Sequence, residues 1–535
     1  MSKRSILFVI DAMAFDVVRD WLASDRLPNL ARMIQDGGSL HPCVSIFPSI
    51  TPAATCSIAT GCYPKEHGIE GACWYDSETN DTAYFGDDLR LVLQEGMHEY
   101  LVDFGDRLNF ERLKSPLIYE QASAQGIDSA SLNFMWFRGP HRHSRSTPIG
   151  IRLAAGSLGD EVYGPKYLKL GDFVHDLPEG VGQVEGMETG MFGKYGFHDD
   201  TTSACLMAMA KAGKLPPLTV AYYPLNDSDA HEEGLTQAAS KRLTRFDEFL
   251  GEFVEQLGGW GVVGRDFSFI MVGDHSQSEP KGAEMNSIQL DDHLHDFRRG
   301  DFGNGISDDV QLLICPNMRS AAIYFADECF DVRREVVYRV LKDPNVDQII
   351  MENVELDGRK KYIVASSDRG RLEFWRAGGR DDDDHCDLDE HHRVHRAEDP
   401  YGNRWAFCGD LETVDCRVDE HGKVIEGRYP NAFERIEGAF TEGASPVWVT
   451  AKPGAEFSVP EVRQHPGGSH GSLHEDDSIS GLLVSSDLSL KLSSDDRPRA
   501  RIVDVMQLCL ESIGAERWPA NKIKSVDVST SSPTH

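Results

Sequence analysis

The sequence predicts an α/β fold in which a mostly parallel sheet is sandwiched by helices and an α+β lobe is inserted into the core. Apolar runs of strand length alternate with amphipathic segments of helix length in the first half of the chain and again near its end. The chain of 535 residues exceeds the roughly 250–300 residues that a single hydrophobic core usually serves. Between about residues 280 and 460 the alternation stops, and strand-like runs separated by polar loops replace it.

The chain divides into three parts on this basis. Residues 1–280 are expected to form the first part of the core, residues 281–459 the inserted lobe, and residues 460–535 the last part of the core. Residues 76–196 show no clear repeating pattern and are expected to carry substrate-facing loops, and residues 358–419 are expected to be rich in loops. From Lys524 the chain has the polar composition of a disordered tail.

Local signals place the elements in order. Buried strands are expected where apolar residues run together, and helices where an amphipathic run opens on a proline or closes on a glycine. The expected core strands are Ser5–Ile10, Ser39–Ile46, Leu218–Tyr223, Phe267–Val272 and Ile479–Val484. The expected helices are Phe15–Ala23, Pro28–Gln35, Thr51–Thr60, Thr202–Ala212, Leu235–Leu257 and Ile502–Ile513. The expected lobe strands include Val310–Cys315, Tyr362–Ala365 and Val447–Ala451.

Charge and cysteine usage limit the partners and the compartment. The formal net charge of -33 repels nucleic acid and anionic membranes, so we expect neither as a partner. The apolar run that follows Lys3 and Arg4 is too short for a signal peptide, and no run approaches the roughly 18 apolar residues of a membrane span. Eleven cysteines without a CxxC pair indicate free thiols in a reducing compartment. We therefore expect a cytoplasmic protein; the sequence does not reveal its oligomeric state.

Three aspartates follow core strands at the points where those strands end. Asp11 follows ILFVI, Asp227 follows LTVAYYPLN, and Asp274 follows FSFIMVG. Open α/β sheets bind their ligands at the carboxyl ends of the strands. We therefore expect the three carboxylates to meet at one edge of the sheet.

Three histidines accompany these aspartates. His275 is next to Asp274, His231 stands four residues after Asp227, and His470 lies in the glycine-rich segment GGSHGS. Carboxylates and imidazoles together suit Zn²⁺, with Mn²⁺, Co²⁺ or iron as substitutes. Six such ligands can divide around two divalent ions, and ions about 3.5–4 Å apart can stabilise both the attacking and the leaving oxygen of a phosphoryl displacement.

Thr51 fits the role of a nucleophile beside such ions. It precedes Pro52 in the stretch FPSITPAATCSIATGCYPKEHGI, where we expect Thr51 to be the N-cap and Pro52 the first residue of a short helix. A threonine hydroxyl is a weak nucleophile unless a metal lowers its pKa. The N-terminus of the helix adds a partial positive charge for a phosphate group.

The ordered motifs resemble those of the alkaline phosphatase superfamily, on the branch of nucleotide pyrophosphatases, type I phosphodiesterases and phosphonoacetate hydrolases. Those enzymes share an N-terminal strand ending in Asp, a threonine followed by TG-x-x-P-x-x-HGI, a D-x-x-x-H pair, a DH pair and a late HG. The matching positions here are Asp11, Thr51 with TGCYPKEHGI, Asp227 with His231, Asp274 with His275, and His470. The resemblance covers both ends of the chain and implies an alkaline-phosphatase-like fold.

The resemblance also implies how the ligands divide. One metal would be held by Asp227, His231 and His470. The other would be held by Asp11, Thr51, Asp274 and His275. In that scheme Thr51 attacks a small phosphorylated substrate and forms a phosphothreonine. The implied activity is hydrolysis of phosphomonoesters or phosphodiesters; a phosphonate hydrolase, a phosphate-transferring mutase and a non-catalytic scaffold remain alternatives.

Three positions depart from the motifs of the family. Ala230 replaces a glycine before His231, and Ser276 replaces the glycine after the DH pair. Nucleotide pyrophosphatases resemble HGI-x-x-N, where the asparagine helps to hold a phosphate oxygen, and this chain has Ala72 at that place. The substrate contacts are therefore expected to differ from those of nucleotide pyrophosphatases.

Other polar segments have competing interpretations. The run RDDDDHCDLDEHHRVH, residues 380–395, is interpreted as a solvated acidic loop in preference to a metal site. Arg138, in FMWFRGPHRH, either contacts a substrate anion or pairs with a nearby carboxylate. We expect His67 to order its own turn and His474 to stand behind the ligands.

Overall fold

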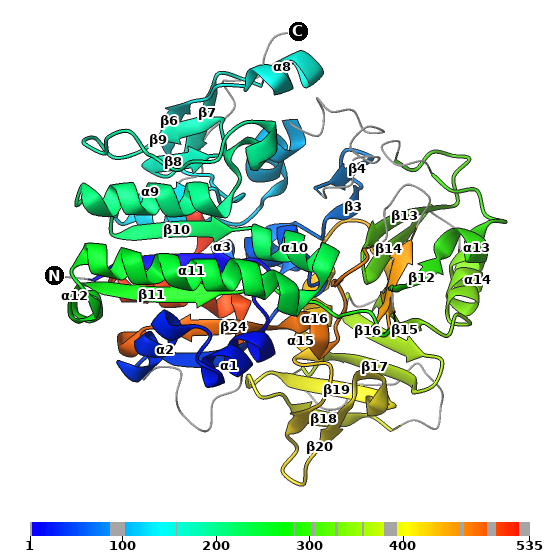
Figure 1. Cartoon of the computed structure of the whole chain (residues 1–535). Helices are drawn as coiled ribbons and strands as arrows, with labels where there is room; N and C mark the ends of the chain where they lie inside the picture. The colour runs from blue at the N-terminus through cyan, green and yellow to red at the C-terminus, as the bar shows by residue number, and fades with distance from the viewer. Residues whose placement is uncertain are drawn as a thin grey trace.

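The computed structural model describes residues 3–85, 102–156, 158–282, 284–300, 305–326, 330–355, 358–378, 393–458, 465–488 and 499–523. Figure 1 shows a large mixed sheet flanked by helices, beside a second sheet that occupies the right of the view. This architecture confirms the predicted α/β fold with a mostly parallel main sheet.

In the described part of the chain, the main sheet has nine strands. In spatial order they are β25 (Ala500–Arg501), β2 (Ser39–Val44), β24 (Ile479–Val484), β11 (Phe267–Val272), β1 (Arg4–Ile10), β10 (Leu218–Tyr223), β5 (Ser129–Leu132), β8 (Tyr167–Leu170) and β9 (Val174–Asp176). The five strands from β11 to β8 run parallel, whereas β24 runs antiparallel to both of its neighbours. The loop that enters β24 therefore lies at the edge where β11, β1 and β10 end.

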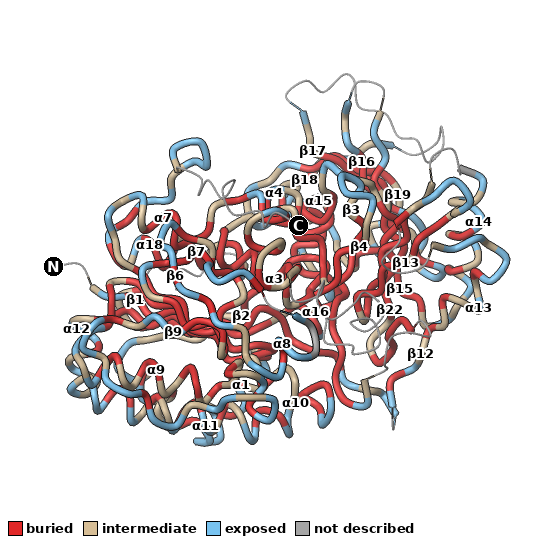
Figure 2. Tube along the Cα trace, turned by 90° about the horizontal axis from the view of Figure 1, so that it is seen from above, coloured by how far each residue is buried: buried red, intermediate tan, exposed pale blue. Residues whose placement is uncertain are grey.

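Helices cover both faces of this sheet because alternate residues of β1 point to opposite sides. Ile6 and Phe8 pack with helices on one face, and Leu7 and Val9 pack with helices on the other. The first set is α1 (Phe15–Ala23), α2 (Pro28–Gln35), α9 (Asp199–Lys211) and α11 (Leu235–Leu257). The second set is α3 (Thr51–Thr60), α7 (Ile118–Ala124) and α18 (Val505–Ser512). Figure 2 shows the buried strands between α9 and α11 below and α7 and α18 above.

The second sheet is antiparallel throughout and has eight strands. In order they are β13 (Leu312–Asn317), β14 (Ser320–Phe325), β22 (Val447–Ala451), β15 (Val346–Val354), β16 (Lys360–Ser366), β17 (Gly370–Arg376), β19 (Arg404–Gly409) and β18 (His395–Glu398). One face packs against α14 (Phe330–Val340), and α15 (Ala432–Ala439) packs within the core that the two sheets share. The proposed domain boundaries at 280 and 460 stay predictions.

Most core elements begin and end where the sequence predicts them. The bounds of α1, α2, α3, β10, α11, β11, β22 and β24 agree to the residue. One detail is wrong: Thr51 is already helical, and Ile50 is the N-cap. Two segments expected to be rich in loops contain more strands than predicted. Within 358–419, β16 covers the predicted strand Tyr362–Ala365, and β17, β18 and β19 are additional; within 76–196 lie β5, β8 and β9, which widen the main sheet.

Buried polar contacts join the two sheets. Glu70 accepts hydrogen bonds from Tyr324 Oη at 2.8 Å and from Thr441 Oγ1 at 2.6 Å. Burial raises the pKa of Glu70 to about 7. Arg435 of α15 is fully buried, and its guanidinium donates to the carbonyls of Ile46 and Leu473, both at 2.9 Å. Arg435 thus connects the segment before Thr51 to the segment after His470.

The cysteines are mostly thiols, as predicted. Eight of them are free in the described part of the chain: Cys43, Cys56, Cys62, Cys73, Cys205, Cys315, Cys416 and Cys509. Cys408 differs, because it is disulfide-bonded. The cytoplasmic location stays a prediction.

Among the described helices, none combines the length and the apolar character that a membrane crossing requires.

Candidate active site

Sheet topology brings the three aspartates together. β11, β1 and β10 are adjacent parallel strands, and Asp274, Asp11 and Asp227 each lie just beyond the carboxyl end of one of them. Asp227 lies in the first turn of α10 (Leu225–Glu233), four residues before His231, so both side chains share one face of that helix. Asp11 and Asp274 are buried.

Two overlapping groups of candidate metal ligands form at this edge. Asp227, His275 and His470 form one group, and Asp11, Asp274 and His275 form the other; within each group the ligand atoms lie within 4.8 Å of one another. His231 Nε2 lies 3.2 Å from Asp227 Oδ2 and therefore adjoins the first group. His275 Nε2 lies 3.4 Å from Asp11 Oδ1 and 3.5 Å from Asp274 Oδ2. These groups differ from the expected partition in two ways: His275 contributes to both of them, and His231 adjoins the first group without belonging to it.

The three histidines are oriented in the same way. Their Nδ1 atoms face backbone carbonyl oxygens: His231 faces Gly468 at 2.8 Å, His275 faces Ser276 at 3.0 Å, and His470 faces Ser49 at 2.7 Å. A carbonyl oxygen only accepts hydrogen bonds, so each Nδ1 carries the proton and donates. Each Nε2 then presents its lone pair to the carboxylates, as in metal-binding histidines.

The carboxylates favour a cation at this place. Burial and the neighbouring charge of Asp274 raise the pKa of Asp11 well above its ordinary value, because two close buried carboxylates repel each other. Asp11 Oδ1, Asp274 Oδ2 and His470 Nε2 are buried atoms that find no hydrogen-bond partner among the described residues. Buried polar atoms are normally satisfied, so acceptors that converge in this way fit divalent cations.

Neighbouring side chains fix the candidate ligands. Tyr222 Oη donates a hydrogen bond to Asp11 Oδ2. Asn226 Nδ2 donates to the backbone oxygen of Asp11 at 2.8 Å, and Gln277 Nε2 donates to Asp227 Oδ1 at 2.5 Å. Such partners orient metal ligands, and they contribute as much to a site as the ligands themselves.

Thr51 lies at this cluster. Its Oγ1 is 3.0 Å from His275 Nε2, and Thr51 is the first residue of α3. The helix ends at Gly61, whose φ of 63° suits a residue without a side chain. Ser49, two residues earlier, is the residue whose carbonyl faces His470. The segment that carries the hydroxyl is therefore tied directly to a candidate ligand.

Several other expectations are settled by contacts. Arg138 donates to Glu120 Oε2 at 3.1 Å and to the carbonyls of Leu113 and Ser115, so it pairs with a carboxylate and does not face substrate. His67 orders its own turn as predicted, since Ile69 N donates to its Nδ1 at 3.1 Å.

The remaining expectations concern His474, Ala72 and the acidic run 380–395. His474 caps the short helix α16 (Glu475–Ser478), and its ring contacts Tyr429. At Ala72 the backbone N–H donates to Asn317 Oδ1 at 2.8 Å, a structural contact from the second sheet. Of the acidic run 380–395, residues 380–392 lie outside the described residues.

Sequence reasoning missed a pair of residues behind His231. The ring of His465 lies 4.2 Å from that of His231, centroid to centroid. Glu456 is buried, and its carboxylate makes two contacts with His465. It accepts a hydrogen bond from the backbone N–H of His465 at 2.7 Å and contacts Nδ1 of His465 at 3.0 Å. The only signal in the sequence is the position of His465 five residues before His470.

Weakening this support should weaken metal binding. We expect Glu456→Gln to raise the dissociation constant for Zn²⁺ about tenfold, because loss of a partner behind a ligand typically costs 10–100-fold. Competition with a chromogenic chelator for Zn²⁺ measures this dissociation constant. Glu420→Gln, at an exposed carboxylate, serves as the control. Equal Zn²⁺ affinity in the two variants would show that His465 does not support His231.

The fold and the site together define an α/β protein with two groups of candidate metal ligands at one edge of its main sheet. The family model described as type I phosphodiesterase/nucleotide pyrophosphatase matches residues 5–473. The chain belongs to this family, which confirms the predicted resemblance, and it is a phosphoric ester hydrolase of the phosphodiesterase type.

Solved structures support the fold. Murine ectonucleotide pyrophosphatase/phosphodiesterase 5 superposes with a TM-score of 0.53 at 12% sequence identity, over 97% of each chain. An inactive variant of that murine protein in complex with AMP gives a TM-score of 0.52 at 13% identity, again over 97% of each chain. At these identities the likeness shows the fold alone. No curated protein matches the sequence.

Proposed function

We propose that the protein hydrolyses phosphodiesters through a phosphothreonine intermediate on Thr51, at a site that holds two divalent metal ions. The observation that carries the proposal is the approach of Thr51 Oγ1 to within 3.0 Å of His275 Nε2, inside the group formed with Asp11 and Asp274. The relative solved with AMP supports a small phosphorylated substrate of the nucleotide class. Ala72 stands where nucleotide pyrophosphatases have an asparagine that helps to hold a phosphate oxygen, so this protein should contact its substrate differently.

The chemistry divides between two steps. Thr51 Oγ1 bonds to phosphorus while the bond from phosphorus to the leaving alcohol breaks, and the alcohol departs with a proton. Water then attacks the same phosphorus, releases the phosphomonoester and restores the threonine hydroxyl. When bound, the ions would lower the pKa of Thr51 and neutralise charge on the phosphoryl oxygens. Asp11, Asp274 and His275 would hold one ion, and Asp227, His231 and His470 the other.

The position of Thr51 at the start of α3 favours its attack on phosphorus, which is the first step. Thr51 stands at the positive end of α3, where a developing negative charge on the phosphoryl group is stabilised. The hydrogen bond from His470 Nδ1 to the carbonyl of Ser49 limits movement of the segment that leads to the nucleophile. The hydroxyl is thus held in place before the substrate binds, which lowers the entropic cost of attack.

A panel of esters together with metal analysis tests this function. We expect bis(4-nitrophenyl) phosphate to be cleaved with a higher kcat/KM than 4-nitrophenyl phosphate or 4-nitrophenyl phenylphosphonate. The last two esters report monoesterase activity and phosphonate activity. We also expect roughly two transition-metal ions per chain, whose removal by a chelator abolishes turnover and whose return restores it. Full activity in the chelated protein would contradict the proposal.

A further inference from the structure

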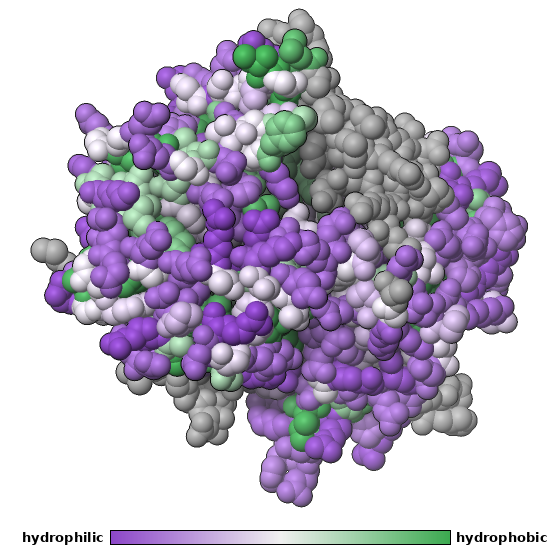
Figure 3. All heavy atoms as spheres, viewed as in Figure 1, coloured by the Kyte–Doolittle hydropathy of each residue, from purple (hydrophilic) through white to green (hydrophobic). Residues whose placement is uncertain are grey.

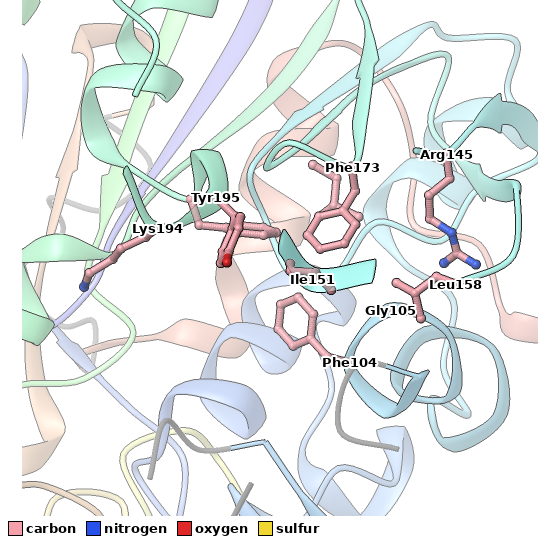
Figure 4. Close-up of a pocket in the computed structure, with 10 residues that line it drawn as sticks. Phe104, Gly105, Arg145, Ile151, Leu158, Phe173, Lys194 and Tyr195 are labelled. Atoms are coloured by element: carbon pink, nitrogen blue, oxygen red, sulfur yellow. The ribbon is translucent and has the colours of Figure 1, made fainter. Parts of the chain in front are cut away.

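An apolar cavity of about 210 Å³ lies apart from the metal-ligand cluster, in the part of the chain between β4 (Asp81–Tyr84) and α9. Its wall is mostly aromatic and aliphatic, and includes Phe104, Ile151, Leu158, Phe173, Tyr195 and Phe197. Figure 4 shows the rings of Phe104, Phe173 and Tyr195 grouped around Ile151. An apolar cavity of about 150 Å³ holds one benzene. This cavity therefore has room for an aryl ring or a short alkyl chain.

The charged groups at the cavity are engaged elsewhere. The guanidinium of Arg145 donates to both carboxylate oxygens of Asp106, at 2.7 and 3.1 Å, and to the carbonyl of Gly159 at 2.7 Å. Lys194 extends away from the cavity in Figure 4. An occupant would therefore meet an apolar wall and, among the described lining residues, no available cation.

The elements that wall the cavity also expose large apolar side chains. α8 (Ile149–Ala155) carries Ile151 inward and leaves Leu153 82% exposed, and η2 (Met191–Gly196) leaves Phe192 97% exposed. Ile149 and Met191 are exposed on the same two elements. Figure 3 shows a hydrophobic patch over α8, at the top of the view. An apolar molecule would thus meet apolar side chains around the cavity.

A hydrogen bond connects this region to the candidate active site. Lys194 Nζ donates to Ser228 Oγ at 2.8 Å, and Ser228 follows Asp227 in α10. The side chain of Lys194 and the residue Ser228 therefore connect the segment that walls the cavity to a candidate metal ligand. We propose that the cavity binds an apolar alkyl or aryl substituent of the phosphodiester substrate, an inference that rests on the proposed function.

A homologous series of substrates tests this inference. For 4-nitrophenyl alkyl phosphodiesters from methyl to hexyl, kcat/KM should rise up to about fourfold per added methylene until the cavity is filled. Ile151→Trp fills the cavity and should flatten the series. Gly105→Val is a second filling variant, because a Cβ at Gly105 meets its neighbours only at 3.4 and 3.5 Å. Leu153→Trp, on the exposed face of the same helix, is the matched control.

The outcomes separate the inference from the proposed function. Hydrolysis of all esters at rates independent of chain length would overturn the inference and leave the phosphodiesterase assignment intact. If no ester is hydrolysed, the proposed function fails, and calorimetric titration of the methyl and hexyl diesters into the protein decides the inference. Tighter binding of the hexyl diester that Ile151→Trp removes would support the cavity; equal affinities would refute it.

Discussion

Thr51→Ala should lower kcat/KM for phosphodiester hydrolysis by about 10³-fold or more, because removal of a covalent nucleophile leaves only binding and electrostatic stabilisation. The loss should appear in kcat, since the candidate metal ligands and the substrate contacts remain. Steady-state kinetics with bis(4-nitrophenyl) phosphate measure it. Thr51→Ser, which keeps a hydroxyl at the same place, should recover part of the activity.

The matched control lies on the same helix. Thr60 is buried near the last turn of α3, and its hydroxyl donates to the carbonyl of Cys56 at 2.8 Å. Thr60→Ala removes a comparable hydroxyl far from the cluster and should leave kcat within about twofold, since it removes no contact with a candidate ligand. All three variants should keep most of the metal, because the other candidate ligands remain. Undiminished turnover by Thr51→Ala would rule out the nucleophile.

Arg435→Met should have the largest effect on stability. The substitution leaves several buried acceptors without a donor, among them the carbonyls of Ile46 and Leu473 and the hydroxyl of Ser478. Each unsatisfied buried acceptor costs about 1–3 kcal/mol, partly offset because no guanidinium has to be desolvated. We expect a net loss of about 3 kcal/mol and a Tm lower by about 3 °C in thermal unfolding.

Activity should fall along with stability in this variant. Ile46 leads into the segment of Ser49 and Thr51, and Leu473 follows His470, so both sides of the site lose a common anchor. Arg428→Met breaks an exposed pair with Asp415 and should change the free energy of unfolding by less than about 1 kcal/mol. If the two arginine variants unfold at the same temperature, the buried guanidinium does not hold the site together.

Much of the core could be predicted because its signals are local. The apolar run of β11 and the proline and glycine at the ends of α3 define those elements within a few residues of sequence. The convergence of Asp11, Asp227 and Asp274 also follows from sequence, since each residue comes just after a strand of one parallel sheet.

The parts that sequence reasoning missed depend on distant partners. β5 and β8 have four residues each, too few for a clear pattern, and they are strands because β10 offers a free edge. The strands β17 to β19 are separated by polar turns that resemble a loop-rich segment. Likewise, nothing near Arg435 in sequence reveals that it bonds to the carbonyl of Ile46, 389 residues away. Roles of this kind arise only from the packing of the two sheets.

The covalent intermediate is the most direct test of the account. The protein is mixed with bis(4-nitrophenyl) phosphate, quenched with acid during turnover, digested and analysed by mass spectrometry. We predict that the peptide containing Thr51 carries a nitrophenylphosphoryl group, and that Thr51→Ala yields no adduct. Rapid turnover with an unmodified Thr51 peptide, and release of product by direct attack of water, would contradict the account.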